Sequence, residues 1–188
     1  MERAYNPPRK YEEHAYVLDF NPRKKSITVR GREGIIVTAI GEDRLTLLEI
    51  LGVPNSSFDV GEKIFIGKEG RTKVLSVLGK MDYKSISSSA QTELQGVVEK
   101  IVTENEQRFV DYLNNARPLT PRIHALELIP GIGKTYMKAM LEERDKKKFE
   151  SLEDLQKRIG LKEPQKQISK RIMEEITGET RMNLFVKR

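Results

Sequence analysis

The sequence contains no cysteine and only two histidines among its 188 residues. The absence of cysteine excludes disulfides, thiolate zinc sites, iron–sulfur clusters and cysteine nucleophiles. The two histidines, His14 and His124, lie far apart in the chain, and we expect neither to be catalytic. Walker, His-Glu-x-x-His and Gly-x-Ser-x-Gly motifs are also missing. The sequence therefore predicts a protein that is not an enzyme and has no cofactor.

Long apolar runs are missing as well. No segment approaches the roughly 20 apolar residues needed to span a membrane, and the start of the chain, Met1-Glu2-Arg3-Ala4, has no apolar signal region. We therefore expect a cytoplasmic protein with no membrane partner. Hydrophobic residues make up 37% of the chain and charged residues 33%, which predicts modest cores in one large or two small domains.

The formal net charge of +6 is unevenly distributed along the chain. Residues 1–80 carry 14 Lys/Arg and 11 Asp/Glu, a net charge of +3, and residues 81–120 carry 4 and 6, a net charge of −2. Residues 121–188 carry 16 and 11, a net charge of +5. The basic excess at the two ends favours polyanionic partners, although a solvated surface would also account for an excess of this size.

Residues 14–80 consist of short apolar runs separated by turn residues, a pattern typical of strands. We expect strands within 14–20, 26–30, 34–40, 44–51, 63–66 and 73–78, with residues 21–25 as a turn. The connections leave no room for crossover helices, so the sheet should be antiparallel. The number and length of the strands predict a small closed or nearly closed barrel, OB-like as the first choice and SH3-like as the second.

Two interpretations of the barrel surface stay open. Its basic residues are Arg23, Lys24, Lys25, Arg30, Arg32, Arg44, Lys63, Lys68, Arg71 and Lys73. With Tyr16, Phe20 and Phe65 as stacking platforms, they could line a groove for single-stranded nucleic acid. Alternatively, the aromatics belong to the core and the basic side chains are solvated residues of sheet edges.

Leu126-Glu127-Leu128-Ile129-Pro130-Gly131-Ile132-Gly133-Lys134 is the most specific local signal. The glycines permit a sharp turn between two helices, and the second helix would present free N–H groups at the positive end of its dipole. Such an end binds phosphate well. The predicted binding residues are Gly131, Ile132, Gly133 and Lys134 through their N–H groups, and Lys134 and Lys138 through their side chains.

This segment resembles the hairpin of the helix-hairpin-helix family, apolar-x-x-apolar-x-Gly-apolar-Gly. Leu126, Ile129, Gly131, Ile132 and Gly133 fill all five defined positions, whereas Met137 stands where the family usually has alanine. The resemblance implies binding to the sugar-phosphate backbone of DNA or RNA without reading the base sequence. It also allows a monovalent cation held by hairpin carbonyls.

A second, degenerate copy of the pattern lies 29 residues further on. Leu155, Gly160 and Leu161 match the pattern, but Arg158 and Lys162 replace an apolar residue and the second glycine. Gly160 and Lys162 join the predicted binding residues. DNA glycosylases also contain such a hairpin, but the Gly/Pro-rich segment and catalytic aspartate that follow it in those enzymes are not found here.

Helical spacing also predicts the other elements. We expect a helix from Ser88 or Ser89 to about Val102 and another that includes Phe109 and Leu113. Further helices are expected over residues 121–128, 134–144 and 164–176, with one more starting at Ser151. The predicted fold is α+β, with a flexible arm (1–13), an OB-like β-barrel (14–80), a helical connector (81–118), an all-α double helix-hairpin-helix domain (119–180) and a basic tail (181–188) that is either docked or free.

This combination resembles an uncharacterised archaeal family described as predicted nucleic-acid-binding OB-fold proteins. The resemblance implies nucleic-acid binding, with RNA favoured over DNA. We therefore predict a nucleic-acid-binding protein that grips phosphates without sequence specificity. The alternatives are a protein-interaction module and an accessory factor of a nucleic-acid-processing enzyme that has no active site of its own.

Overall fold

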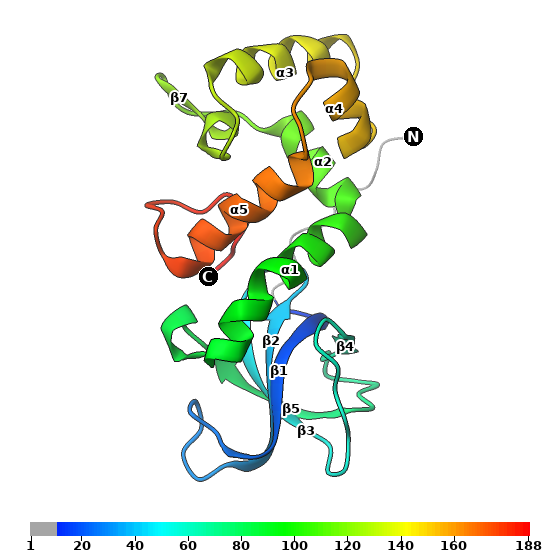
Figure 1. Cartoon of the computed structure of the whole chain (residues 1–188), viewed down its shortest axis with the longest axis vertical. Coiled ribbons are helices and arrows are strands. Elements are labelled where there is room, and N and C mark those ends of the chain that lie inside the picture. The colour runs from blue at the N-terminus through cyan, green and yellow to red at the C-terminus, as the bar shows by residue number, and fades with distance from the viewer. Residues whose placement is uncertain (1–10) are drawn as a thin grey trace. The chain divides into compact units, whose positions relative to one another are not determined.

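The computed structural model describes residues 11–188, so most of the arm expected at residues 1–13 lies outside the described part. The chain has a mixed α+β fold divided into two compact units (Figure 1). Unit 1 consists of the chain up to Glu93 together with Phe185–Arg188, and unit 2 consists of Leu94–Leu184. The helix α1 (Ser88–Glu104) crosses this boundary. The segment 81–118, predicted as one connector, is therefore shared between the two units.

Unit 1 contains a curled antiparallel sheet of five strands. They are β1 (His14–Lys25), β2 (Glu33–Gly41), β3 (Leu47–Gly52), β4 (Lys63–Phe65) and β5 (Val74–Lys80). The strand order is β4-β1-β2-β3-β5, which makes β4 and β5 the two edges of a half-barrel. All four pairings are antiparallel, which confirms that prediction.

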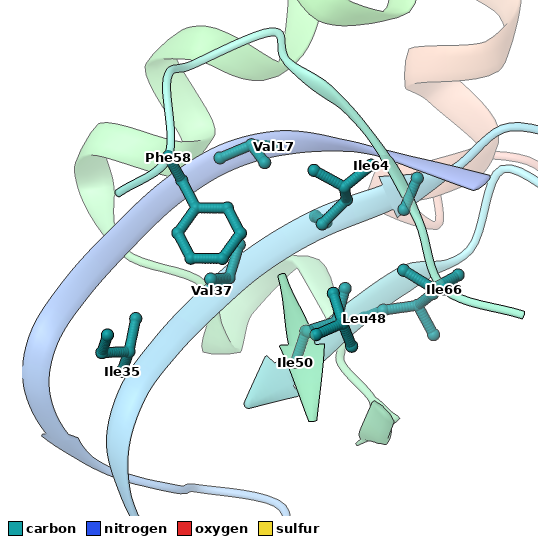
Figure 2. Close-up of a cluster of buried hydrophobic side chains, with 11 residues drawn as sticks. Val17, Ile35, Val37, Leu48, Ile50, Phe58, Ile64 and Ile66 are labelled. Carbon is teal, nitrogen blue, oxygen red and sulfur yellow. The ribbon is translucent and has the colours of Figure 1, made fainter. Parts of the chain in front are cut away.

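The core of unit 1 lies on the concave side of this sheet. Alternate residues of β2, Ile35, Val37 and Ala39, point into it, because successive side chains of a strand face opposite sides. Figure 2 shows side chains from β1, β2, β3 and β4 gathered in this cluster, with Phe58 beside Val17 and Val37. The opposite face is also covered, since Tyr16 is completely buried. Strands buried on both faces explain why residues 34–40 read as a nearly continuous apolar run.

The predicted turn at residues 21–25 is wrong, because β1 continues through it to Lys25. The register of β1 against β2 shifts between Asn21 and Lys24, around Pro22. Proline has no N–H to give to a ladder, but it is tolerated at a bulge on a strand edge. Pairing of β1 with β4 covers only His14–Tyr16, so Pro22 lies where β1 has one neighbour.

The predicted strand at residues 26–30 is also wrong. These residues form a loop between β1 and β2 in which Ile27, expected to point inward, is 53% exposed. The β-branched residues Ile27, Thr28 and Val29 favour a strand, but a buried glutamate, Glu49, accepts the N–H groups of Ile27 and Thr28. A tertiary hydrogen bond has thus replaced the ladder that the local pattern predicts.

Unit 2 is mainly helical. After a short 3-10 helix in unit 1, η1 (Tyr83–Ser85), the elements are α1, α2 (Glu106–Asn115), β6 (Pro118–Thr120), β7 (Ile123–His124), a 3-10 helix η2 (Ala125–Leu128), α3 (Lys134–Lys146), α4 (Leu152–Ile159) and α5 (Pro164–Thr177). The predictions of α1, α2, α3, α4 and α5 are confirmed. Ser151 accepts the N–H of Asp154 as the cap of α4, and Gly178 ends α5 with φ of +82°.

The helix predicted over residues 121–128 is wrong. Instead, Pro118–His124 forms a two-stranded hairpin, and only the four residues Ala125–Leu128 are helical. Thr120 does accept a backbone N–H as expected of a cap, but from Ile123 at 3.0 Å in a turn around Pro121. Threonine hydroxyls stabilise turns as well as helix starts, so the signal was ambiguous.

The last four residues dock on unit 1. Phe185 is buried, the N–H of Lys187 donates to the Arg44 carbonyl at 3.0 Å, and Thr46 donates its hydroxyl to the Lys187 carbonyl at 3.2 Å. The docked alternative for the tail is therefore the observed one. No helix within residues 11–188 has the length and apolar character needed to cross a membrane.

Candidate functional site

The turn between η2 and α3 is built around Gly131 and Ile132. Gly131 has φ of +78°, a left-handed conformation that favours glycine, and an added Cβ would lie 2.8 Å from the Gln167 side chain. Ile132 is buried, and its N–H donates to the Ile129 carbonyl at 3.0 Å. Leu126 and Ile129 are also buried. The apolar positions of the motif thus anchor the turn, as the pattern predicts.

Of the four N–H groups predicted as donors, that of Ile132 is already bonded, so the continuous run of free N–H groups at the start of α3 begins at Gly133. The first hydrogen bond of α3 runs from the Met137 N–H to the Gly133 carbonyl at 2.9 Å. Among the described residues, the N–H groups of Gly133, Lys134, Thr135 and Tyr136 have no acceptor. The Ile132 N–H, predicted to be offered to a ligand, is already bonded, and this corrects the predicted donor set.

Gly133 differs from Gly131 in what it requires. It has φ of −81° and ψ of −175°, which any residue can adopt, and an added Cβ would meet no atom of residues 11–188 within 4 Å. The expectation that alanine at both glycines would strain the turn therefore holds only for Gly131. Gly133 leaves open space directly in front of the helix N-terminus, and a side chain there would fill that space.

The start of α3 is positively charged. Its first turn contains no acidic residue, and Lys134 and Lys138 are both exposed. Within residues 11–188 neither lysine forms an ion pair, whereas Lys146 near the end of α3 pairs with Glu143 at 2.7 Å. The two lysines and the positive end of the helix dipole would therefore all attract an anion at Gly133.

The turn between α4 and α5 repeats the first turn in part. Gly160 has φ of +76° and Leu161 after it is buried, like Gly131 and Ile132. However, the Gly160 N–H donates to the Gln156 carbonyl at 2.8 Å, and Glu163 stands at the start of α5. Lys162 is exposed. The Glu163 side chain makes no cap hydrogen bond and pairs with Lys166 at 2.7 Å, so the second helix start has an acidic residue that the first lacks and offers less to an anion.

A buried histidine shapes the entry to the first turn. The Nδ1 atom of His124 accepts the N–H of Leu126 at 3.1 Å, and Glu127 accepts the N–H of His124 at 2.9 Å. This is a capping box with histidine in the cap position. Burial, and to a lesser degree the positive charge of Arg144, lower the pKa of His124 below its ordinary 6.5. The negative charge of Glu127 acts in the opposite direction but is outweighed. The ring is therefore neutral at pH 7, as its acceptor role requires.

Acidification should loosen the start of η2. Since the pKa of His124 is lower in the folded than in the unfolded chain, its contribution to stability is complete above pH 6.5 and is lost as pH falls through the folded pKa. Hydrogen-exchange protection of residues 124–129, corrected for the intrinsic slowing of exchange in acid, should therefore fall as pH decreases, above the range where carboxylates titrate. His124→Asn keeps a side-chain acceptor but cannot titrate, so its protection should lose this pH dependence. An equally strong dependence in the variant would contradict the assignment.

A buried ion pair on α5 holds the other side of the turn. Arg171 donates to the Leu128 carbonyl at 3.1 Å and to the Met182 carbonyl at 2.7 Å. Its Nε lies 3.8 Å from Glu175, a residue with no exposed surface that accepts the N–H of Leu184. The pair thus links the end of η2 to α5 and to the segment after it.

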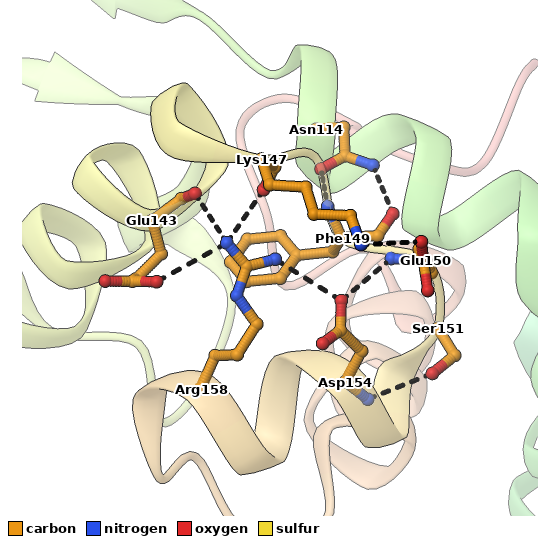
Figure 3. Close-up of polar contacts among 8 residues, drawn as sticks. All are labelled: Asn114, Glu143, Lys147, Phe149, Glu150, Ser151, Asp154 and Arg158. Carbon is orange, nitrogen blue, oxygen red and sulfur yellow. Dashed lines mark hydrogen bonds and ion pairs between the residues drawn. The ribbon is translucent and has the colours of Figure 1, made fainter.

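Arg158 fixes the other end of α3 (Figure 3). It donates to the carbonyls of Glu143 at 2.6 Å and Lys147 at 2.8 Å, and its guanidinium lies 4.6 Å from the centre of the Phe149 ring. Asp154 lies 3.3 Å from the same guanidinium. The replacement of an apolar residue by arginine in the second motif therefore has a structural role: Arg158 bonds the last carbonyls of α3.

Two of the barrel aromatics are not stacking platforms. Tyr16 is completely buried, and the ring centres of Phe20 and Phe58 lie 5.9 Å apart beside the core. The core interpretation is therefore correct for both. Phe65 lines a groove of about 890 Å³ in unit 1, together with Lys68 and Lys80.

Sequence reasoning found the turn but missed part of its surroundings. Thr135 and Tyr136 contribute free N–H groups in the first turn of α3, and their position directly after Lys134 would have indicated this. The spacing His124-x-x-Glu127 is that of a capping box and could also have been noticed. No local sequence pattern indicated that Arg171 would bond the Leu128 and Met182 carbonyls. Within residues 11–188 no group of three or more acidic or histidine side chains is arranged to hold a metal ion.

The fold and the site define a two-unit α+β protein with a half-barrel and a helical unit that contains a repeated glycine turn. A family model described as "Protein of unknown function (DUF655)" matches residues 11–187. The chain belongs to this family, which has archaeal members. The chain is 39% identical over 184 residues to the uncharacterized protein MJ0038 of Methanocaldococcus jannaschii, covering 97% of this chain and 83% of that protein.

A solved structure from the same family is also similar. The crystal structure of Af1531 from Archaeoglobus fulgidus matches with a TM-score of 0.82 and 37% sequence identity. The match covers 94% of this chain and all of that chain. The descriptions of these relatives assign no activity to them. The predicted membership in an uncharacterised family with archaeal relatives is confirmed, and its function is a matter of proposal.

Proposed function

We propose that this protein binds the phosphate backbone of nucleic acid, RNA rather than DNA, through the turn between η2 and α3, and that it does so as a helix-hairpin-helix without enzymatic activity. The observation that carries the proposal is the open space at Gly133 in front of free N–H groups at a helix start. Lys134 and Lys138, which form no ion pair with the described residues, supply the charge. The preference for RNA rests on the family resemblance alone.

The ligand is a phosphate because the donors fit one. Backbone N–H groups at a helix N-terminus point at the anion and carry the positive end of the dipole. Such contacts carry no sequence information, so binding should be nearly independent of base sequence. We expect the Gly160 turn to contribute less to phosphate binding, since the acidic residue Glu163 stands at the start of α5. A monovalent cation on hairpin carbonyls is compatible with the resemblance but is not needed for these contacts.

The test is the substitution of Gly133. Gly133→Asp is compatible with the backbone and places a preferred cap residue at the start of α3, so the fold should be kept or slightly stabilised. Its carboxylate would occupy the N–H donors and repel phosphate. We expect affinity for a labelled RNA to fall about tenfold or more, as loss of charge-assisted hydrogen bonds predicts. Fluorescence anisotropy at several salt concentrations measures it.

Two matched variants separate the causes. Gly133→Asn occupies the same donors without charge and should weaken binding less than Gly133→Asp. Gly96→Asp adds the same charge in unit 2 at a glycine of α1 that also faces open space, and it should leave affinity unchanged. If Gly133→Asp is folded and binds RNA like the parent protein, this turn is not the site.

A protein-interaction module is the second candidate function. One observation favours it: Leu119 and Ile123 of the β6–β7 hairpin are each 41% exposed and, with Met182, line a groove of about 500 Å³ in unit 2. Exposed apolar residues around a groove are typical of protein-binding surfaces. The accessory-factor alternative would use this groove for the enzyme and the Gly133 turn for the nucleic acid.

A further inference from the structure

Residues 23–32, the end of β1 together with the loop that follows it, form a basic loop with a high density of positive charge. Its cations are Arg23, Lys24, Lys25, Arg30 and Arg32, and it contains no acidic residue. All but Lys24 are exposed. None of the five forms an ion pair with any residue in the described part of the chain, whereas Lys63 and Lys73 of the same unit are paired with glutamates.

A buried glutamate holds this loop in one shape. Glu49 of β3 has no exposed surface, and its carboxylate accepts the Ile27 N–H at 3.1 Å, the Thr28 N–H at 3.1 Å and the Thr28 hydroxyl at 2.6 Å. It also accepts the Ser26 hydroxyl. Burial by itself would raise the pKa of Glu49, but these hydrogen bonds outweigh burial and lower the pKa below its ordinary 4.5. The carboxylate is therefore ionised at neutral pH.

Other contacts close the same loop. The N–H of Ser26 donates to the Arg32 carbonyl at 2.8 Å, and Gly31 takes φ of +79° in the turn between them. Gly79 of β5 has no side chain where Thr28 packs, since an added Cβ would lie 3.3 Å from Thr28. Strands β3 and β5 thus each provide a residue that accommodates the loop. A loop with this many fixed backbone atoms loses little entropy when it binds a ligand.

We infer that this loop, residues 23–32, is a second binding site for the phosphodiester backbone of nucleic acid, preformed by Glu49. The inference rests on the proposed function in that the ligand is the same polynucleotide. Arginine guanidinium groups bind phosphate through paired hydrogen bonds, and the guanidinium groups of Arg23, Arg30 and Arg32 have no partner to displace within residues 11–188. Ile27, 53% exposed among them, offers an apolar contact to a sugar or an unpaired base.

Neutralising the loop tests the charge. In the full chain, Lys25→Gln, Arg30→Gln and Arg32→Gln together should weaken binding of a labelled single-stranded RNA about tenfold or more. The log–log salt slope should fall by about 2, because each phosphate contact on a single strand contributes about 0.7. Lys157→Gln, Lys166→Gln and Lys146→Gln remove three paired surface lysines as a charge-matched control, and they should change the slope little.

Substitution of Glu49 tests the positioning. Glu49→Gln makes the loop more positive, so simple electrostatic attraction predicts tighter RNA binding. If Glu49 holds the loop in its binding shape, the amide fails to accept all four hydrogen bonds and binding weakens despite the added charge. Thr28→Val removes one of these bonds without changing charge and serves if Glu49→Gln does not fold. Weaker binding by a folded variant supports the inference, and tighter or unchanged binding overturns it.

The outcomes distinguish this site from the Gly133 turn. If Gly133→Asp binds normally and the loop variants bind weakly, the proposed function of the turn fails and the loop is a site. If Gly133→Asp binds weakly and the neutralised loop binds like the parent protein, the loop inference fails alone. Absence of RNA binding by the parent protein overturns both. Equal competition by poly-glutamate would overturn the assignment to nucleic acid, since it would identify an acidic protein as the partner.

Discussion

Replacing Arg171 with methionine should lower the free energy of unfolding of unit 2 by about 3–5 kcal/mol, because it removes the Arg171 charge that faces the buried Glu175. Glu175 is completely buried, and the Leu128 and Met182 carbonyls would also lose their donor. Urea unfolding followed by far-ultraviolet circular dichroism measures the loss. Hydrogen exchange of residues 125–133 should quicken with it, because Arg171 bonds the end of η2.

The buried charge can be removed in a second step. Arg171→Met combined with Glu175→Gln keeps an acceptor for the Leu184 N–H without a charge, and it should recover at least half of the loss. Lys170→Met, an exposed neighbour on α5, should change stability by less than about 0.5 kcal/mol. If the single variant loses less than about 1 kcal/mol, Glu175 is satisfied by other groups and the pair does not hold the turn.

Replacing Arg158 with methionine should cost about 2–3 kcal/mol, the range of hydrogen bonds from a charged donor to groups that are then left unpaired. The carbonyls of Glu143 and Lys147 lose their donor, and the Phe149 ring loses the guanidinium above it. The last turn of α3 should fray, with faster hydrogen exchange at residues 143–147. Since α3 presents the candidate site only at its other end, RNA affinity should change less than stability.

Geometry rather than charge accounts for the role of Arg158. Arg158→Lys retains the charge but cannot bond both carbonyls and cover the ring at once, so it should recover less than half of the loss. Lys157→Ala removes an exposed lysine paired with Glu153, and it should cost less than about 0.5 kcal/mol. Full recovery by lysine would show that the charge alone is sufficient.

Local sequence patterns predicted the structure correctly where the residues that determine an element or a turn all lie within it. The turn at Gly131 was predicted because left-handed backbone and an apolar anchor leave a short, specific sequence pattern. The helices α1, α3, α4 and α5 were predicted because their apolar spacing and caps lie within the segment. The half-barrel was predicted as an antiparallel sheet, because its short connections exclude crossovers. Its OB-like character and the binding residues remain predictions.

Tertiary structure decided the positions where a distant group competes with the local pattern. Residues 26–30 have the composition of a strand, but Glu49, more than 20 residues away, takes their N–H groups. Thr120 and Pro121 fit a helix start, but the same hydroxyl caps a turn between β6 and β7. The sequence indicates no role for His124, but burial lowers its pKa and keeps the ring neutral, and its Nδ1 atom accepts the Leu126 N–H as a cap.

The sequence by itself determined the two-part organisation of strands followed by helices, the glycine turn and the charge at each end. These features depend on period, backbone freedom and composition, which are properties of neighbouring residues. Only the tertiary structure decided that Ile132 donates its N–H internally, that Gly133 faces open space and that the β1–β2 loop is held by Glu49. These depend on which distant atoms fill or leave the space around a group, and no local pattern records that.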